Sequence, residues 1–489
     1  MNSFAPASGD DVVASPISHA RFAIAATLIT LGVYVLTIAP DLTWANASFD
    51  GVELIIASAT LGVPHPPGYP TYVVLGKLFS FLPIGSVAFR YNFFSAFATA
   101  LAAGLLVPSI GALYPRVRPP AVMATALLFG FAPLVWSQAI VTEIYGLNLL
   151  ALALFLAVWS RKGPSLWSGF LLGLAVTTHL TSLFFLPALL ISSGRRFLWP
   201  LLGWTIGLTP LLATPFLAAG DSPVIWGQPN DLAGWWWLVS GRLYRANLQP
   251  GFDAGHLAAL LQAIVLGPAL MVTSRGAKAP MMRIDAQANV KRQPMTTWLG
   301  LTAILYIAFA LFYRTPDAAV LLLPVFLIVA ILIAPLLDRL GIAALFLPLA
   351  LVVLTFNIRD LGGDFTVRQS AESLLDSAPE NALLLTPGDR TIFTVLYFQH
   401  IEGSRTDLRI VDANLFAFDW YRSRLKTLYP DLFVPERDDL ILLKQNNVRE
   451  RPFCLVSIVS ASDQFFMADP LAAELSMITP QLYCRESPE

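Results

Sequence analysis

The sequence predicts an all-α polytopic membrane protein with a small α/β domain at its C-terminal end. Apolar residues make up 56% of the chain and charged residues only 13%. A soluble domain typically carries about a quarter of charged residues. The mean hydropathy is +0.65. The apolar residues gather in runs of roughly 20 residues, the length that a helix needs to cross a bilayer.

Composition and motifs also exclude several classes of protein. The net charge of −1 gives no reason to expect a nucleic-acid partner. The only cysteines are Cys454 and Cys484, too few for a thiolate metal cluster. The chain contains no Walker A loop, HExxH motif or Rossmann fingerprint. Direct use of nucleotide energy is therefore not expected.

The predicted membrane region covers residues 21–356 and follows a polar N-terminal tail, 1–20. Its first span, at 22–40, is interpreted as an uncleaved anchor, with signal cleavage near Ala45 as the alternative. Segment 41–90 then holds two apolar stretches that are too short to cross a bilayer and fit interfacial or re-entrant helices. About eleven spans are predicted in all. The others are 91–113, 120–138, 141–159, 166–193 as two short helices, 197–218, 256–274, 297–313, 318–337 and 340–356.

Charge placement predicts the orientation of these spans. With the N-terminus in the cytoplasm, Lys and Arg concentrate in the loops on the cytoplasmic side, as the positive-inside rule requires. These loops are 114–119, 161–165, 194–196, 275–296 and 338–339. The first outer loop, 41–90, and the second, 220–255, hold fewer cations. We therefore expect an integral protein of a bacterial inner membrane, with a cytoplasmic N-terminus and an extracytoplasmic C-terminal domain.

Residues 357–489 have the composition of a soluble domain. Short apolar runs at 382–385, 408–411 and 454–459 predict buried strands, and 391–400 predicts a helix. Outside the cytoplasm Cys454 and Cys484 can form a disulfide. Two buried free thiols are the alternative.

The first outer loop contains two carboxylates, Asp50 and Glu53. One interpretation is structural: Asp50 is the N-cap of a helix, and Glu53 lies near its positive end. The other is functional. A carboxylate beside aromatic and lipid groups is partly desolvated, and this makes it a stronger base for removing a proton from a hydroxyl.

Further polar residues lie at predicted outer ends of helices. His65 begins a stiff Pro-Pro-Gly turn; the turn explains the prolines but not the histidine. Glu143 either reaches the interface or lines a cavity. Arg90 either anchors at the headgroups or meets a phosphate.

The second outer loop adds Arg242, Tyr244 and Arg245. Arginine binds phosphate in a bidentate manner and stabilises charge on a phosphate leaving group. The tryptophans at 235–237 are interpreted as an interfacial belt. Asp317 either pairs with Arg314 or faces the same cavity.

These motifs together resemble a known family. The segment 49–53 followed by His65-Pro66-Pro67-Gly68 is similar to the hallmark of the transmembrane protein 260-type family, which is glycosyltransferase family 117 of the GT-C superfamily. The likeness extends over most of the chain, and one departure is Val52, where members often carry a glycine. The other similar segments are 143–145, 178–181, 226–227 with 242–244, and 388–390 through 419–421.

The resemblance implies a GT-C fold and a mannosyltransferase that takes its sugar from a polyprenyl phosphate. The acceptor would be a hydroxyl of a protein or glycan. Asp50 would be the base and Glu53 its partner or an acceptor ligand. The implied substrate and donor ligands are His65, Arg90 and Arg242 for the phosphate, with Glu143, Tyr145, His179 and Tyr244 around the cavity. No cofactor is expected, although carboxylates leave a divalent metal open.

Two other functions compete with this one. A transporter or flippase of a lipid-linked sugar precursor would place polar, broken helices near the bilayer midplane and often show internal repeats. Here the charged candidates gather at the outer face, and the sequence shows no repeat. A scaffold or receptor without chemistry is the third possibility, and neither rival needs a base.

Overall fold

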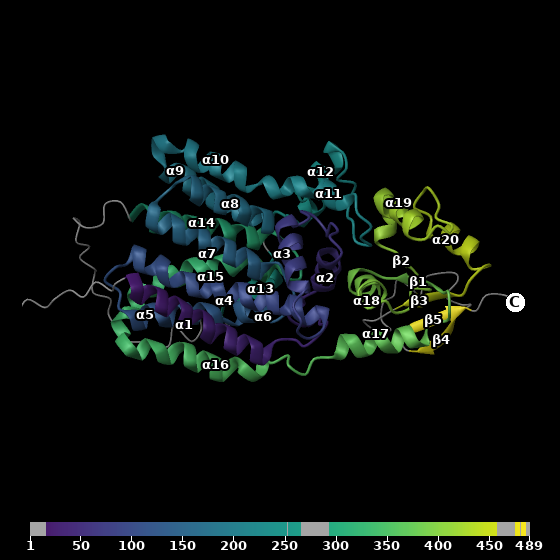
Figure 1. Ribbon diagram of the computed structural model, residues 1–489, viewed down its shortest axis with the longest axis horizontal. Helices are drawn as coiled ribbons and strands as arrows, with labels where there is room; N and C mark the ends of the chain where they lie inside the picture. The colour runs from purple at the N-terminus through teal and green to yellow at the C-terminus, as the bar shows by residue number, and fades with distance from the viewer. Residues whose placement is uncertain (1–15, 252, 266–292, 457–474, 480, 486–489) are drawn as a thin grey trace, which may run out of the picture.

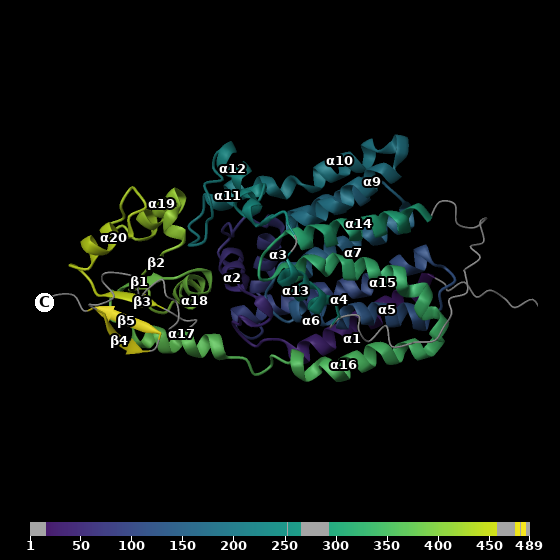
Figure 2. The same ribbon diagram turned by 180° about the vertical axis from the view of Figure 1, so that it is seen from behind.

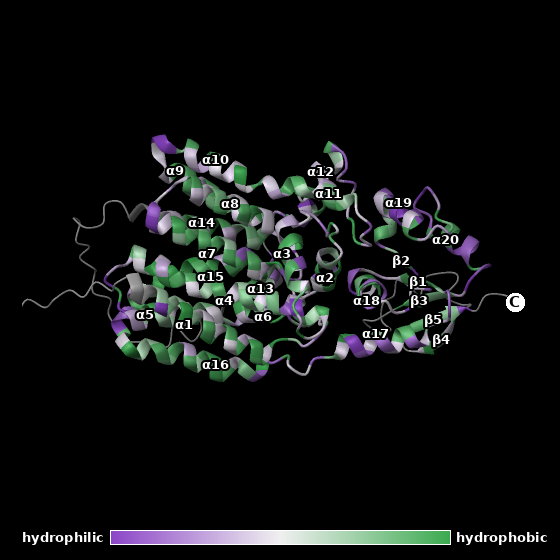
Figure 3. Cartoon of the chain, in the orientation of Figure 1, coloured by the Kyte–Doolittle hydropathy of each residue, from purple (hydrophilic) through white to green (hydrophobic). Residues whose placement is uncertain are grey.

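The computed structural model describes residues 16–251, 253–265, 293–456, 475–479 and 481–485. A bundle of helices lies along the long axis, and a smaller α/β domain covers one end of it (Figure 1). The view from behind shows the same division (Figure 2). Hydrophobic residues dominate the bundle, whereas hydrophilic residues gather at its ends and in the α/β domain (Figure 3). This distribution is that of a membrane-embedded bundle with a water-exposed domain.

Most helices of the bundle bury apolar faces in one continuous core, and α13 packs in a smaller apolar cluster. Most of these helices are long runs of Leu, Ala, Val and Phe without internal charge, which favour helix in a bilayer. They are α1 (Pro16–Thr37), α4 (Val87–Leu113), α5 (Pro119–Phe131), α6 (Pro133–Ala139), α7 (Tyr145–Lys162), α8 (Leu166–Thr178), α9 (Leu186–Ser192), α10 (Leu198–Gly207), α11 (Thr214–Ala218), α13 (Ala254–Val265), α14 (Gln293–Phe312), α15 (Leu323–Leu337) and α16 (Phe346–Arg359).

Within the residues that the structure describes, five helical runs are long and apolar enough to cross a membrane, and the pair α5–α6, bent by 62°, adds a sixth if it is counted as one span. The runs are Ala20–Thr37, Val87–Leu113, Gly194–Ala218, Met295–Phe312 and Ala318–Arg359. The last run covers two predicted spans, because the helix breaks at Gly341 (φ 57°, ψ −133°). The number of about eleven therefore stays a prediction. Part of span 256–274 and most of loop 275–296 lie outside the described residues.

The predicted break within 166–193 is confirmed. Helix α8 ends at Thr178, and His179 has an extended backbone (φ −160°, ψ 128°). A 3₁₀ helix, η2 (Leu180–Phe185), then leads into α9. The His179 ring closes the break by accepting a hydrogen bond from the Thr181 amide at 3.4 Å. His179 thus lies at an end of two short helices, as expected.

The first outer loop forms two short helices, α2 (Gly51–Ala59) and α3 (Pro70–Ser80). Both are too short to cross a bilayer, in agreement with the prediction. Helix α2 is buried along nearly its whole length. It lies between the bundle and the α/β domain in both views (Figures 1 and 2). It is therefore an internal wall rather than a helix on the lipid surface.

The α/β domain contains a sheet of order β2-β1-β3-β5-β4. Strand β1 pairs in parallel with β2 and β3, while β5 is antiparallel to β3 and β4. The predicted strands at 382–385 and 408–411 and the predicted helix are confirmed, as is the first part of the strand predicted at 454–459, of which residues 457–459 lie outside the described residues. Strands β4 and β5 were not predicted. The elements are α17 (Thr366–Ser377), β1 (Leu383–Thr386), α18 (Asp389–His400), β2 (Arg409–Asp412), α19 (Asp419–Leu428), α20 (Leu440–Asn447), β3 (Phe453–Val456), β4 (Ser476–Thr479) and β5 (Leu482–Arg485).

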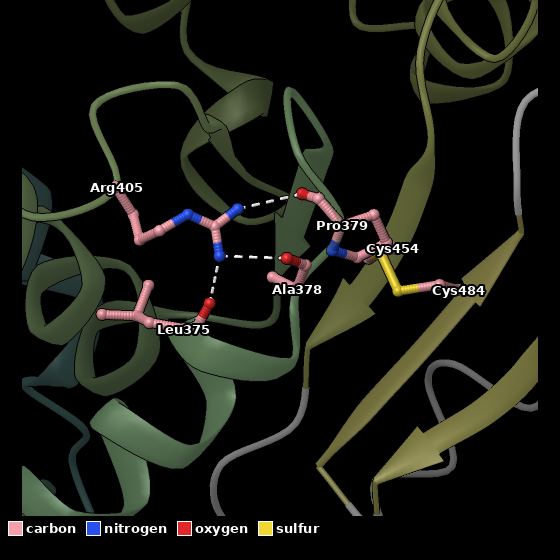
Figure 4. The surroundings of a disulfide bond; sticks show 6 residues. All are labelled: Leu375, Ala378, Pro379, Arg405, Cys454 and Cys484. Atoms are coloured by element: carbon pink, nitrogen blue, oxygen red, sulfur yellow. Dashed lines mark hydrogen bonds between the residues drawn. A yellow bond between two sulfur atoms is a disulfide. The ribbon is translucent and has the colours of Figure 1, made fainter.

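Cys454 and Cys484 form a disulfide between β3 and β5. The two residues are directly opposite each other in the strand register. Arg405 supports the same domain by donating hydrogen bonds to the carbonyl oxygens of Ala378 at 2.9 Å and Pro379 at 3.0 Å, and to that of Leu375 (Figure 4). Of the two alternatives for these cysteines, the structure has the disulfide.

Polar and aromatic contacts fix the α/β domain on the end of the bundle. The Arg368 guanidinium forms an ion pair with Asp41 at 3.0 Å. The Ala88 amide donates a hydrogen bond to the Tyr397 hydroxyl at 3.3 Å, and Trp420 packs on Trp226 with ring centroids 5.2 Å apart. These contacts hold α18 against α2, so that α18 covers this part of the first outer loop.

Candidate active site

A cavity of about 700 Å³ lies at the end of the bundle that faces the α/β domain. Its lining comes from the first outer loop, the starts of α7 and η2, the 3₁₀ helix η5 (Arg242–Asn247), the α14–η7 turn (η7, Ala318–Leu322) and α18. Segments that are far apart in the sequence therefore meet here. The charged and histidine side chains of the lining are Asp50, His65, His179, Arg245, Asp317 and Asp389.

Asp50 directly precedes α2 but does not cap it. The residue has φ −90° and ψ −9°, and its side chain makes no capping hydrogen bond. The first residue of α2 is closely packed: a Cβ on Gly51 would lie 2.4 Å from Ser48 Oγ and 2.7 Å from the Thr142 carbonyl oxygen. The structural interpretation therefore explains the position of Asp50 but not its carboxylate, which faces the cavity and His65.

His65 bridges the two carboxylates of the first outer loop. Glu53 Oε1 accepts a hydrogen bond from the His65 amide at 2.7 Å, and Glu53 Oε2 lies 2.6 Å from His65 Nδ1. On the other side of the ring, Nε2 lies 3.6 Å from Asp50 Oδ2. Glu53 is 1% exposed, whereas the Asp50 side chain keeps 43% of its surface open. Glu53 thus fixes the ring from the protein interior, and Asp50 is the carboxylate that a ligand can reach.

The electrostatics of this group favour a charged imidazole. Burial alone would lower the pKa of His65, but Glu53 and Asp50 outweigh it and raise that pKa to about 10. Desolvation by the cavity walls raises the pKa of Asp50 although part of its side chain is open to the cavity, and the neighbouring His65 charge offsets part of this effect. Near neutral pH the loop therefore presents a resident cation beside a carboxylate that is more basic than a surface aspartate.

Aromatic rings enclose the His65 side chain. Tyr69, Trp226 and Tyr244 meet it edge to face, with centroid distances of 5.1, 6.3 and 6.1 Å. The turn that presents Tyr69 is unusual, because Gly68 has φ +87° and Tyr69 itself lies in the left-handed region. The rings limit the access of water to the imidazole, which strengthens its interaction with the carboxylates.

Several other predicted residues also gather here. Tyr145, His179 and Tyr244 line the cavity. The rings of Tyr145 and His179 are 5.7 Å apart, and His179 Nδ1 lies 2.7 Å from Thr181 Oγ1. Glu143 is 4% exposed and lies behind the lining. Its carboxylate therefore belongs to the protein interior next to the cavity and not to the cavity surface.

Two predicted phosphate ligands lie elsewhere. The Arg90 guanidinium donates to the carbonyl oxygens of Ser80 at 2.6 Å, Ile84 at 3.0 Å and Gly85 at 3.3 Å, so it holds the loop before α4. Arg242 is exposed and is not part of the lining. Arg245, three residues further along η5, lines the cavity instead. The sequence pointed to Arg245 as well, but spacing alone does not tell which arginine of a short helix turns inward.

Two further carboxylates complete the lining. Arg314 pairs with Asp253 at 3.1 Å, and Asp317 faces the cavity. Asp389, the first residue of α18, was not predicted as a site residue. The relevant pattern was a strand followed by the short turn Pro387-Gly388 and a helix that begins at Asp389, which places Asp389 at the carboxyl end of a parallel strand. Only the docking of the domain shows that this end faces the cavity.

Asp50, Glu53 and His65 also have the spacing of a metal site. Each offers one ligand atom, and these atoms lie within 4.8 Å of one another. A protonated imidazole cannot bind a metal, and His65 Nδ1 is already engaged by Glu53. A divalent ion would therefore have to displace the proton that the two carboxylates stabilise.

Comparison with known proteins gives two matches to family models. Residues 50–194 match the N-terminal domain of the protein O-mannosyl-transferase TMEM260 family, and residues 367–430 match the TMEM260-associated domain 2. The chain therefore resembles the TMEM260 family in two separate parts, which together make up less than half of its length.

Curated relatives carry the same family name. This chain is 24% identical to protein O-mannosyl-transferase TMEM260 of Mus musculus, over 85% of this chain and 66% of the mouse protein. It is 22% identical to protein O-mannosyl-transferase tmem260 of Dictyostelium discoideum, over 89% of this chain and 64% of that protein. The chain thus spans slightly less than two thirds of the length of these relatives.

Solved structures share the fold. ArnT from Cupriavidus metallidurans bound to undecaprenyl phosphate matches with a TM-score of 0.56 and 14% identity, over 96% of this chain and 98% of that one. The apo state of the same protein gives a TM-score of 0.52. The chain therefore has the GT-C fold, and with its apolar helices it is an integral membrane protein.

The raised pKa of His65 predicts a pH-dependent stability. Because the folded pKa of about 10 lies above the ordinary histidine pKa of 6.5, the charged ring contributes stability that is fully present below pH 6.5 and is lost as the pH rises through about 10. The melting temperature of the purified protein should fall over this window in the wild type and much less in His65→Gln. His256→Gln serves as the control, because His256 lies outside the cavity lining. Parallel melting curves for wild type and His65→Gln would contradict the prediction.

Proposed function

We propose that this protein transfers mannose from a polyprenyl-phosphate-linked donor to a hydroxyl group of a protein or glycan on the extracytoplasmic side of the membrane. The observation that carries the proposal is the Asp50 carboxylate, which makes no capping bond and faces a cavity beside the buried cation His65. The relatives are named protein O-mannosyl-transferases, and this favours a protein acceptor. A structure with the same fold holds undecaprenyl phosphate, and this favours a polyprenyl carrier.

In this proposal Asp50 is the general base. The acceptor oxygen forms a bond to the anomeric carbon of the sugar while the bond from that carbon to the phosphate oxygen breaks. The hydroxyl proton goes to Asp50, and the electron pair of the broken bond stays on the phosphate. Attack opposite the leaving group inverts the anomeric centre. The burial that raises the pKa of Asp50 makes this carboxylate a better proton acceptor.

His65 contacts Asp50 directly, and Glu53 acts on Asp50 through His65. The Glu53 carboxylate holds Nδ1, so the ring is oriented with Nε2 toward Asp50. The imidazolium keeps Asp50 ionised until the acceptor arrives, and its position at the cavity wall also favours the negative charge of the leaving phosphate. Holding donor and acceptor in one cavity supplies much of the rate, because it replaces a bimolecular encounter.

Arg245 is the proposed ligand of the donor phosphate. It lines the cavity on the same side as Tyr244 and Asn247, with its side chain exposed. A lipid-linked donor enters from the bilayer, so its phosphate stays near the interface while its sugar reaches Asp50. The arginine fork can bind two phosphate oxygens at once.

We further propose that the reaction needs no metal ion. The His65 imidazolium already supplies the positive charge between the carboxylates that a divalent cation would otherwise provide. Transfer in membranes washed with EDTA should equal transfer in untreated membranes. Loss of activity in EDTA, with recovery on adding Mg²⁺ or Mn²⁺, would overturn this part of the proposal.

Replacement of Asp50 tests the central claim. With radiolabelled polyprenyl-phosphate-mannose in membranes, Asp50→Asn should lower transfer roughly 10²–10⁴-fold, because a positioned base contributes about this factor. Asp231→Asn is the matched control: Asp231 is an outer-face N-cap whose carboxylate does accept a capping bond, from the Gly234 amide at 2.7 Å. Asparagine caps helices as well as aspartate, so this variant should keep its activity. Equal transfer by Asp50→Asn and wild type would remove Asp50 from the mechanism.

A pair of neighbouring arginines tests the phosphate ligand. Arg245→Gln should raise the KM for the donor roughly tenfold or more, the range expected for a lost hydrogen bond between charged groups. Arg242→Gln should leave that KM within about twofold, because the Arg242 side chain is not part of the lining. The reverse pattern would show that η5 turns the other arginine toward the donor.

A further inference from the structure

The α/β domain contributes a side chain to the cavity through the start of α18. Helix α18 packs against α2, and in both views it lies between α2 and β1 (Figures 1 and 2). Strand β1 ends at Thr386, and after Pro387 and Gly388 the helix begins at Asp389. The carboxyl end of a parallel strand in an α/β sheet is where such domains ordinarily bind ligands. Here this end lines the cavity.

The turn before Asp389 is firmly held. Gly388 has φ +142°, a conformation that side chains rarely adopt, and a Cβ there would lie 3.1 Å from Asn414 Nδ2. The Asn414 amide group donates a hydrogen bond to the Pro387 carbonyl oxygen at 2.9 Å. Asp412, at the end of β2, accepts one from the Asn414 backbone amide at 2.9 Å. The position of Asp389 is thus determined by contacts from two strands.

A cation–π contact ties the same turn to the catalytic loop. The Arg390 guanidinium lies over the Phe49 ring, with its central carbon 3.7 Å from the ring centroid. Phe49 directly precedes Asp50, and both line the cavity. Asp389 and Asp50 therefore belong to two elements that contact each other. They face one cavity from the α/β domain and from the first outer loop.

We propose that Asp389 binds the acceptor, and that the preferred acceptor is a hydroxyl-bearing peptide segment with a cationic side chain next to the reacting hydroxyl. The proposal rests on the proposed function and adds its acceptor class. Among the described residues, the lining holds three carboxylates, Asp50, Asp317 and Asp389, against one arginine, Arg245, and the His65 cation. If Arg245 and His65 serve the phosphate and the base, Asp389 is left for the acceptor. A carboxylate forms its strongest hydrogen bonds with charged donors.

The surroundings of Asp389 support this role. Desolvation, with the carboxylates of Asp50, Glu53 and Asp412, raises the pKa of Asp389 to about 7, and His65 opposes this effect. A cationic partner favours the ionised form of such a group. The KM for a cationic acceptor should therefore fall as the pH rises through about 7. An aspartate that only stabilised the start of α18 would not produce this dependence.

The experiment compares two peptides on the full-length protein in nanodiscs, with undecaprenyl-phosphate-mannose as donor. One peptide carries a single Thr flanked by Lys, and the other carries the same Thr flanked by Gln. Asp389→Asn should raise the KM for the Lys peptide roughly tenfold, as expected for a lost charged hydrogen bond. The KM for the Gln peptide, the KM for the donor and kcat should stay within about twofold of wild type. Asp419→Asn is the control, because Asp419 is also the first residue of a helix in this domain and is not part of the lining.

Failure of the inference is distinct from failure of the proposed function. Wild type that transfers mannose, together with an unchanged KM for the Lys peptide in Asp389→Asn, would overturn the role of Asp389 alone. A fall in kcat without a change in KM would also overturn it. If wild type transfers nothing, the proposed function fails, and fluorescence anisotropy of the labelled Lys peptide tests the site directly. Equal affinity of wild type and Asp389→Asn would then overturn the inference, and an at least severalfold weaker affinity of the variant would support it.

Discussion

The buried group Glu53–His65–Asp50 is the interaction on which the rest of the cavity depends. A charged imidazole inside a protein is costly unless opposite charges and hydrogen bonds surround it. Glu53 meets this need on one ring nitrogen and Asp50 on the other. Because the two carboxylates belong to one short helix start, α2 must begin beside the turn that carries His65. The tight contact of Gly51 with Ser48 and Thr142 serves this requirement.

The two parts of the molecule contribute different chemistry to the cavity. The bundle supplies the first outer loop and the ends of several helices, where polar groups can be kept without exposing backbone to lipid. The α/β domain covers α2 and adds Asp389. Its position depends on polar pairs such as Arg368–Asp41 and on the packing of Trp420 against Trp226. The cavity is thus an interface between a membrane bundle and a water-exposed domain.

The disulfide illustrates a contact that the sequence left open. Whether Cys454 and Cys484 pair depends on the register of β3 and β5, and β5 has no strong sequence pattern of its own. Strands β1, β2 and β3 were easier to predict from the sequence, because they are short apolar runs that are buried in the domain core. Local pattern therefore predicted the parallel core of the sheet, while long-range pairing completed it.

By itself the sequence determined that the protein is a membrane-embedded helical bundle with an α/β domain. It predicted Asp50, Glu53 and His65 as site residues, but with His65 as a phosphate ligand, whereas the structure places its ring between the two carboxylates. These residues lie within a short segment, so their proximity follows from local chain geometry. Only the tertiary structure decided that Asp50 leaves α2 uncapped, that Arg245 rather than Arg242 or Arg90 faces the cavity, and that Asp389 joins it. The reason is physical: side chains from distant segments meet only where helix ends and the docked domain pack together, and that packing is a property of the whole fold.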